Sequence, residues 1–136
     1  MKFLLDTSVW LRGAVEPETV PEELRRILDL RDAPFGLSAI SLWEVGKKNQ
    51  MGRLPLKQEL GAWLKEAVGT RIELLPLTPE IVTDAMNLPD FPNRDPADEL
   101  IVATARVHRL TLLTTDTQLK RYRHAQIRHF TPVLEK

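Results

Sequence analysis

The sequence predicts an α/β fold with a mainly parallel central sheet of about five strands, flanked by helices on both faces. Short apolar segments alternate along the chain with longer segments whose apolar residues recur at helical spacing. The 136 residues contain no internal repeat, low-complexity tract or linker rich in Gly and Ser, and the ten prolines fall near element boundaries. We therefore expect a single domain over residues 1–136.

The N-terminal third is predicted to contain two strands, each followed by a helix. A strand over residues 2–5 comes before a helix over residues 21–32, in which Pro21 suits a position in the first turn. The apolar side chains of this helix share one face: Leu24, Ile27 and Leu28. A second strand over residues 35–37 leads into a helix over residues 41–50.

The middle of the chain continues the alternation. Residues 56–68 are predicted to form a helix, residues 72–75 a strand, and residues 78–88 a further helix. The first of these helices has its apolar side chains at helical spacing: Leu60, Trp63, Leu64 and Ala67.

The last third shows the pattern most clearly. We expect a helix over residues 95–109, a strand over 110–113, a short helix over 116–122 and a final strand over 127–130. The long helix carries an apolar stripe that should face the sheet: Ile101, Val102 and Ala105. Ligands of parallel α/β sheets bind beyond the carboxyl ends of the strands, so functional residues should follow the strands.

Composition excludes several kinds of site. Cysteine is absent, which rules out disulfides, thiolate metal sites and cysteine nucleophiles. The apolar run at the N-terminus ends at Asp6, too soon for a signal peptide, and no stretch approaches the ~20 apolar residues of a membrane helix. We therefore expect a soluble, cytoplasmic protein without a membrane partner.

Charge is balanced in total but uneven along the chain. The formal net charge is +0, yet residues 101–136 contain seven Lys or Arg against two acids. Residues 73–99 contain seven acids and only Arg94 as a base. This distribution would suit an acidic pocket beside a basic rim, although solvated helix faces that happen to segregate explain it equally well.

Four acidic residues end predicted strands or lie in the first turns of the helices that follow: Asp6, Glu44, Asp98 and Asp116. Singly, each has a structural explanation, because carboxylates cap helices and favour their N-terminal turns. Ser41 with Glu44 matches a capping box, and Asp116 could cap the last helix. Together they predict a cleft of carboxylates that cannot all stay ionised without a cation. A hard divalent ion such as Mg²⁺ would compensate their charge, and such a site hydrolyses phosphodiesters.

Three neighbouring acids compete for one place in this cluster. At ~100° per residue, Asp98 shares the helical face of Ile101 and should point beyond the strand ends. Asp95 precedes Pro96 and is better suited to cap the helix. Glu99 is rotated off the apolar stripe and should at most help to hold a second ion. We predict that Asp98 is the third acid and that Asp95 and Glu99 have supporting roles.

Other candidate groups are interpreted as structural. The three histidines show no ligand-like pairing, and the six dispersed glycines form no phosphate-binding loop. The three tryptophans are expected to belong to the core rather than to form platforms for base stacking: Trp10, Trp43 and Trp63.

Taken in order, the motifs resemble those of PIN-domain ribonucleases, in particular the VapC-like toxins of type II toxin–antitoxin systems. The first is Leu-Leu-Asp-Thr-Ser-Val at residues 4–9, and the second is Ser-Ala-Ile-Ser-Leu-Trp-Glu-Val at residues 38–45, with Gly-Arg-Leu-Pro-Leu at 52–56 downstream. The third spans residues 94–105, and the fourth is Leu-Leu-Thr-Thr-Asp at residues 112–116. The resemblance runs from residue 1 to about residue 122 and is specific through the order of all four motifs.

The resemblance implies a PIN-like three-layer fold and endonucleolytic cleavage of RNA that depends on Mg²⁺ or Mn²⁺. By position, it implies that the catalytic metal ligands are Asp6, Glu44, Asp98 and Asp116, and that the supporting polar groups are Thr7, Ser8 and Thr114. It also implies a homodimer and a cognate antitoxin. We expect the antitoxin to lie along Trp10, Leu11 and the helices over 21–32 and 41–50, with a cationic side chain among the acids.

Two other functions compete with this interpretation. A non-catalytic PIN-fold scaffold would bind RNA or protein, but it should lose its acids first, and here all four are present. A phosphoacceptor receiver domain is also small and acidic around Mg²⁺, but it would have adjacent acids early in the chain, whereas Thr7 follows Asp6. Labelling by acetyl phosphate would distinguish the receiver domain.

Overall fold

The computed structural model describes residues 1–32 and 34–134, so residue 33 and the last two residues of the predicted domain lie outside the described part. Five parallel strands form one sheet in the order β3-β2-β1-β4-β5. The strands are β1 (Phe3–Leu5), β2 (Phe35–Ser38), β3 (Ile72–Leu75), β4 (Thr111–Thr114) and β5 (Ile127–His129). Every predicted strand is present, and the predicted α/β fold with a parallel sheet is confirmed.

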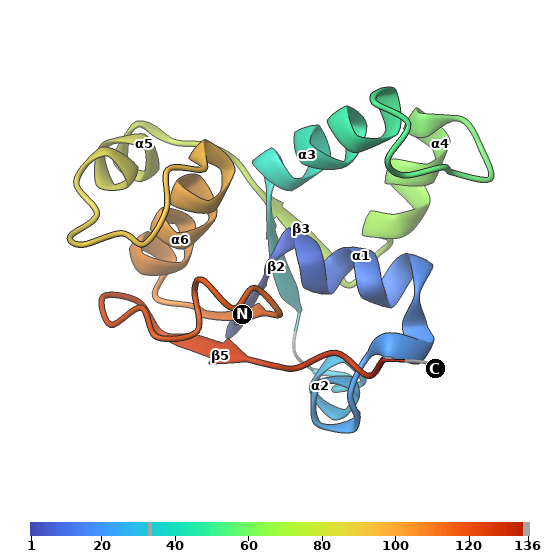
Figure 1. The fold of residues 1–136 in the computed structure, drawn as a ribbon, viewed down its shortest axis with the longest axis horizontal. Helices are drawn as coiled ribbons and strands as arrows, with labels where there is room; N and C mark the ends of the chain where they lie inside the picture. The colour runs from blue at the N-terminus through green and yellow to red at the C-terminus, as the bar shows by residue number, and fades with distance from the viewer. Residues whose placement is uncertain (33, 135–136) are drawn as a thin grey trace.

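Helices cover both faces of this sheet, as Figure 1 shows. They are α1 (Thr7–Val15), the 3₁₀ turn η1 (Pro17–Thr19), α2 (Glu22–Leu28), α3 (Ala39–Gln50), α4 (Leu60–Val68), α5 (Pro79–Met86) and α6 (Pro96–His108). Helices α1, α2 and α4 pack on one face, and α6 packs on the other with α5 outside it. The result is a three-layer arrangement.

Alternation along the buried strands divides the core between the two faces. In β1, Phe3 and Leu5 pack with α1 and α2, whereas Leu4 packs with α6. In β4, Leu113 joins the first cluster and Leu112 the second, in register with Leu5 and Leu4. Neighbouring side chains on a strand point to opposite faces, so these short strands are apolar throughout because both faces are covered.

Helix α1 is absent from the predicted elements. It begins directly after β1, and its N-cap is Asp6, whose side chain accepts a hydrogen bond from the backbone N–H of Thr7. The helix is only nine residues long and contains Gly13 and two valines, which lowers its intrinsic helix propensity. It is stabilised by burial of Val9 and Trp10 against the sheet, which its short sequence does not reveal.

Two further predictions are wrong. Residues 116–122 form successive turns, in which Leu119, Lys120 and Tyr122 each donate a backbone hydrogen bond three residues back, instead of a short helix. Helix α3 begins at Ala39 with Ser38 as its N-cap, so Ser41 and Glu44 lie inside the helix and do not form a capping box. The capping explanation for Glu44 is thereby removed.

The tryptophans differ in burial. Trp10 is buried and Trp63 packs against it in the core, with ring centroids 5.6 Å apart. Trp43 is 58% exposed, so its predicted place in the core is wrong: it lies on the outer face of α3, beside Lys47. Within residues 1–32 and 34–134, no helix is both long enough and apolar enough to cross a bilayer.

Candidate active site

The strand order brings two distant parts of the chain together at one edge of the sheet. Strand β1 pairs with β2 on one side and with β4 on the other, so the sheet is extended in opposite directions from the β1–β4 pair. Ligands in such sheets bind at this switch point, beyond the carboxyl ends of the strands. Asp6 follows β1 directly, and Asp116 follows β4 after one intervening residue.

Asp6 is buried at this edge, with 4% of its surface exposed. Its Oδ1 accepts the Thr7 N–H at 3.0 Å, and its Oδ2 accepts the hydroxyls of Ser8 at 2.9 Å and Thr114 at 2.6 Å. Burial raises the pKa of Asp6, the three hydrogen bonds oppose that rise, and the charge of Asp116 adds to it. A carboxylate has about four lone-pair directions, so one remains for a cation.

The Ser8 and Thr114 hydroxyls, which donate to Asp6, also connect the residues after β1 to the segment after β4. Thr114 Oγ1 accepts the backbone N–H of Asp116 at 3.0 Å, and Ser8 Oγ accepts that of Thr115 at 3.3 Å. Thr114 is fully buried, so its hydroxyl is satisfied only by these protein partners. The Ser8 and Thr114 side chains therefore both help to hold Asp116 in position relative to Asp6.

Glu44 reaches the same region from α3. The Thr7 hydroxyl donates to Glu44 Oε1 at 2.5 Å, and the Ser41 hydroxyl lies 2.7 Å from that of Thr7. Because the single hydroxyl proton of Thr7 is given to Glu44, Ser41 must donate to Thr7. Burial raises the pKa of Glu44, and the charges of Asp6 and Asp95 add to that effect.

Asp98 lies in the first turn of α6, on the side of the helix that packs on the sheet. Its Oδ2 accepts a hydrogen bond of 3.0 Å from Asn93 Nδ2. Burial raises the pKa of Asp98 to about 7, with contributions from the charges of Asp95, Asp6 and Asp116. The face shared with Ile101 is buried against the sheet, as the helical spacing predicts.

The other two acids of this segment occupy different positions. Asp95 is exposed and is the N-cap of α6, where Oδ1 accepts the Ala97 N–H at 3.0 Å, and Pro96 occupies the first turn. Glu99 is half-buried on a neighbouring side of the helix. Asp116 is also half-buried, and its Oδ1 accepts the backbone N–H of Gln118 at 2.9 Å instead of capping a helix.

A family model described as "PIN domain" matches residues 3–125. The chain belongs to the PIN domain family. It is also 30% identical over 121 residues to a protein named Ribonuclease VapC22 from Mycobacterium tuberculosis, a match that covers 89% of this chain and 92% of that protein. The resemblance seen in the four motifs is thereby confirmed.

Solved structures show the same fold. The crystal structure of VapBC2 from Rickettsia felis bound to a promoter DNA fragment matches with a TM-score of 0.73 and 18% identity, over 95% of this chain and 98% of that one. DNA-bound VapBC from Salmonella typhimurium matches with a TM-score of 0.72 and 20% identity, over 95% and 98% of the two chains. FitAcB from Neisseria gonorrhoeae matches with a TM-score of 0.64 and 22% identity, over 92% and 95%.

In this PIN domain, the four predicted acids converge at the carboxyl edge of the sheet. The charges of Asp6 and Asp116 each raise the pKa of Asp98, and the charge of Asp6 also raises that of Glu44. The two ion pairs within the described residues join Arg26 to Glu22 and Arg106 to Asp84, so neither neutralises these acids. The cluster therefore carries negative charge that the described ion pairs leave uncompensated.

The chemistry of these groups fits a hard divalent ion. All four are carboxylates, and Mg²⁺ typically binds through one or two carboxylates with waters and phosphate oxygens as its other ligands. In the described part of the chain, no three His, Cys, Asp or Glu side chains are arranged so that together they could ligate one ion. Instead, hydrogen bonds to Thr7, Thr114 and Asn93 hold the carboxylates separately. An ion here would use few protein ligands at a time.

Three residues with side-chain contacts in this PIN-domain site are not among the predicted site residues: Asn93, Gln118 and Ser41. Asn93 orients Asp98 and also donates to Gln118 Oε1 at 3.0 Å, while Ser41 supports the Thr7 hydroxyl. Asn93 stands just before the capping Asp95, where an asparagine is ordinarily interpreted as a turn residue. Its role depends on the approach of Gln118, 25 positions away, which no local pattern indicates.

Proposed function

We propose that this PIN domain is an Mg²⁺- or Mn²⁺-dependent endoribonuclease and the toxin of a toxin–antitoxin pair. The observation that carries the proposal is the convergence of four carboxylates, without an ion-pair partner, at the edge of the sheet where β1 and β4 end. The relationship of this chain to a protein named as a ribonuclease supports the activity. The fold shared with toxin–antitoxin complexes supports the partner.

Asp6, Glu44, Asp98 and Asp116 are the candidate ligands, of which one or two at a time would hold a divalent ion that neutralises charge at the phosphate and activates water. In three of these acids, one oxygen accepts no hydrogen bond from a described residue: Glu44 Oε2, Asp98 Oδ1 and Asp116 Oδ2. Glu99 would assist only a second ion. Thr7, Ser8 and Thr114 orient the carboxylates through their hydroxyls.

The reaction is hydrolysis of an RNA phosphodiester. Water attacks phosphorus and loses a proton to the carboxylate cluster, and the bond from phosphorus to the 3′ oxygen breaks. The 3′ oxygen leaves as a hydroxyl with a proton from solvent, and the phosphate stays on the 5′ side of the next nucleotide. Attack by the RNA's own 2′ hydroxyl would need a general acid–base pair such as two histidines, and the described polar contacts of the acids include none of the three histidines.

Cleavage of a labelled RNA, with and without metal, tests this proposal. We expect wild-type protein to produce 5′-phosphate ends with Mg²⁺ or Mn²⁺ and to be inactive in excess EDTA. Asp116→Asn should lower the rate at least about a hundred-fold, whereas the exposed matched control Asp29→Asn should cleave normally. Cleavage that persists in EDTA, or 2′,3′-cyclic phosphate products, would contradict the proposal.

The antitoxin would occupy an apolar groove with a volume of about 520 Å³ on the α1–α4 side of the molecule. Of the residues predicted to contact the antitoxin, Trp10 and Leu28 line this groove, whereas Leu11 and helix α3 contribute no lining residue. Trp63 and Ala67 of α4 also line it. Trp10 itself is held by a hydrogen bond from Nε1 to the Ala67 carbonyl at 3.0 Å. None of the four acids lines this groove, so the antitoxin would have to extend beyond it to place a cationic side chain among the acids.

Co-expression tests this partner. Neutralisation of growth arrest and a stable co-purified complex are expected for the antitoxin, and failure of both would exclude the toxin assignment.

We further propose that residues 1–136 act as a single domain, as a homodimer and in the cytoplasm, in keeping with the resemblance to VapC-like toxins.

A further inference from the structure

The loop between β4 and β5 carries positive charge that the proposed cleavage chemistry does not use. Residues 120–124 read Lys-Arg-Tyr-Arg-His, and the sequence has no acid between Asp116 and Glu135. Arg121 and Arg123 are exposed, and neither takes part in an ion pair within the described residues. Arginines grouped in this way are the electrostatic signature of a nucleic-acid site.

Both arginines line a cavity of about 360 Å³. The rest of its lining consists of loop residues Gln118, Tyr122 and His124, with Asp90 and Pro92 from the segment before α6. Two arginines against one aspartate leave the lining positively charged. A cavity of this size is within the range that accommodates a ligand as large as a nucleotide.

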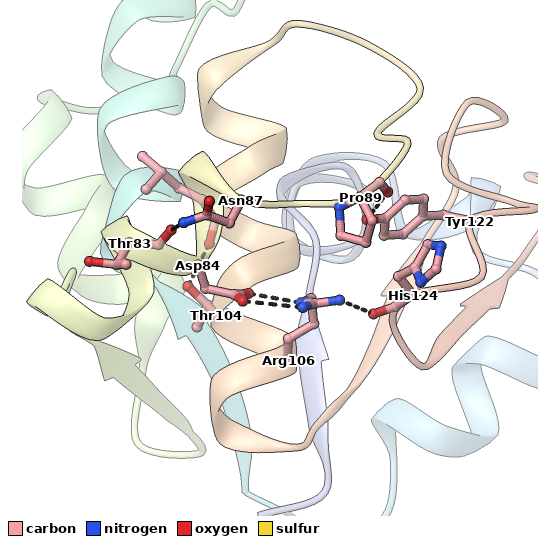
Figure 2. Close-up of polar contacts among 9 residues, drawn as sticks. Thr83, Asp84, Asn87, Pro89, Thr104, Arg106, Tyr122 and His124 are labelled. Carbon is pink, nitrogen blue, oxygen red and sulfur yellow. Dashed lines mark hydrogen bonds and ion pairs between the residues drawn. The ribbon is translucent and has the colours of Figure 1, made fainter.

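The cavity also has an aromatic wall whose geometry is held in place. The Tyr122 ring contacts Phe91 edge-on at 5.3 Å between centroids and His124 at 5.6 Å. The Tyr122 hydroxyl donates to the Pro89 carbonyl at 2.8 Å, as Figure 2 shows. The exposed His124 ring beside Tyr122 offers a surface of the kind on which unpaired RNA bases stack.

A second interaction anchors the loop to the helices. Arg106 on α6 binds both carboxylate oxygens of Asp84 on α5, at 2.8 and 3.2 Å, and donates to the His124 carbonyl at 2.5 Å (Figure 2). The loop is therefore ordered before any ligand binds. Such preorganisation lowers the entropy that binding would otherwise cost.

Gln118 connects this cavity to the acidic cluster. Its Oε1 accepts one hydrogen of the Asn93 amide, at 3.0 Å, and the same Asn93 nitrogen donates to Asp98. Its backbone N–H donates to Asp116 Oδ1 at 2.9 Å. Gln118, which lines the cavity, is therefore one hydrogen bond from Asp116 and, through Asn93, two hydrogen bonds from Asp98, so the cavity lies beside the acidic cluster.

We infer that this cavity is the subsite for the RNA nucleotide next to the scissile phosphate. Arg121 and Arg123 bind its phosphate, and the ring pair of Tyr122 and His124 packs against its base. The inference rests on the proposed nuclease function. It also answers a difficulty of that function, because an acidic cluster repels RNA and a neighbouring basic site is needed to hold the strand over it.

The direct test is binding of a short fluorescein-labelled single-stranded RNA in EDTA, where cleavage is prevented, over a series of salt concentrations. R121A/R123A should weaken binding at low salt about ten-fold, and its plot of log affinity against log salt should be shallower by about 0.7, the value for one lost phosphate contact on a single strand. The matched control R31A/R53A removes two exposed arginines outside the cavity and should leave both quantities unchanged.

A second variant separates the base from the phosphate. His124→Ala should weaken binding of the RNA about five-fold and leave binding of inorganic polyphosphate unchanged, because only the RNA has bases to stack. Melting temperatures of all variants verify that they are folded. Equal binding and equal salt slopes for R121A/R123A and R31A/R53A would overturn the subsite.

The remaining outcomes separate this inference from the proposed function. If wild-type protein cleaves RNA with Mg²⁺ while R121A/R123A binds RNA normally, the subsite is wrong and the nuclease proposal stands. If R121A/R123A loses binding of poly-glutamate but not of RNA, the loop is a site for an acidic protein segment and the inference is overturned. A wild-type chain that neither binds nor cleaves RNA contradicts both.

Discussion

Asp6 is subject to two opposing influences. Removal from water raises its pKa because burial penalises the charged carboxylate, while three hydrogen-bond donors stabilise that same charge. Nearby Asp116 adds repulsion. A bound cation would shift this balance toward the ionised form, since it supplies the charge that the hydrogen bonds only partly provide. The acidic cluster therefore lowers the stability of the folded chain more when no metal is bound than when a metal is bound.

Asp98 provides a pH-dependent test at the scale of one residue. Its pKa is raised from 3.8 to about 7 in the folded chain, so between these values the folded state binds a proton that the unfolded state has released. Stability of the metal-free protein should therefore fall as pH rises from about 4 to about 7. Asp98→Asn is neutral throughout and should melt higher than wild type above pH 7, with the difference closing toward pH 4.

Thermal melts in EDTA across this pH range check the prediction. Asp29→Asn on the exposed end of α2 is the control and should follow wild type. A difference between Asp98→Asn and wild type that is independent of pH would show that Asp98 titrates in the folded chain as it does in the unfolded one. The same variant should be inactive toward RNA.

At the scale of elements, the beginning of α6 combines a structural and a functional acid within one turn. Asp95 caps the helix and Asp98 faces the sheet, because three residues advance the chain by most of a turn. The two roles follow from different physics. Capping needs only the adjacent backbone N–H of Ala97, whereas the position of Asp98 depends on how the whole helix packs on β1 and β4.

Substitution of Asp95 separates these roles. Asp95→Ala should lower the free energy of unfolding by about 1 kcal/mol, and Asp95→Asn should retain most of it, since asparagine also caps well. Both variants remove the charge that raises the pKa of Asp98, so the difference between them isolates the cap. Urea unfolding above pH 7 measures it. Equal stability of the two variants would mean that the Asp95 hydrogen bond contributes nothing.

At the scale of the whole molecule, the site exists only when the chain is folded. Its acids come from the segments after β1 and β4 and from α3 and α6, and Asp6 and Thr114 are 108 positions apart in the chain. A ligand that binds only this assembled site must stabilise the fold in proportion to its concentration. Metal binding is therefore measurable without any cleavage.

Added Mg²⁺ or Mn²⁺ should raise the melting temperature of the wild-type protein. At a concentration of one hundred times Kd, the gain is about 2.7 kcal/mol. The gain should be larger above pH 7, where Asp98 is ionised, than near pH 5, where protons compete with the metal. Asp98→Asn should show a smaller gain at every pH. An equal rise in wild type and Asp98→Asn would indicate that the ion binds elsewhere.

The sequence by itself determined the strands, most of the helices, the cap at Asp95 and the identity of the four converging acids. These follow from apolar periodicity, from the preference of Asp for a cap before Pro96 and from motif order, all of which act over a few neighbouring residues. The helical face of Asp98 was predictable in the same way.

Only the tertiary structure decided helix α1, the turns after Asp116, the exposure of Trp43 and the partners of each acid. Helix α1 has weak local propensity and depends on burial of Val9 and Trp10. The hydrogen bonds of Asn93 to Gln118 and of Thr114 to Asp6 join residues that are distant in the chain. Contacts of this kind form because the packed sheet brings distant segments together, so no window of neighbouring residues contains them.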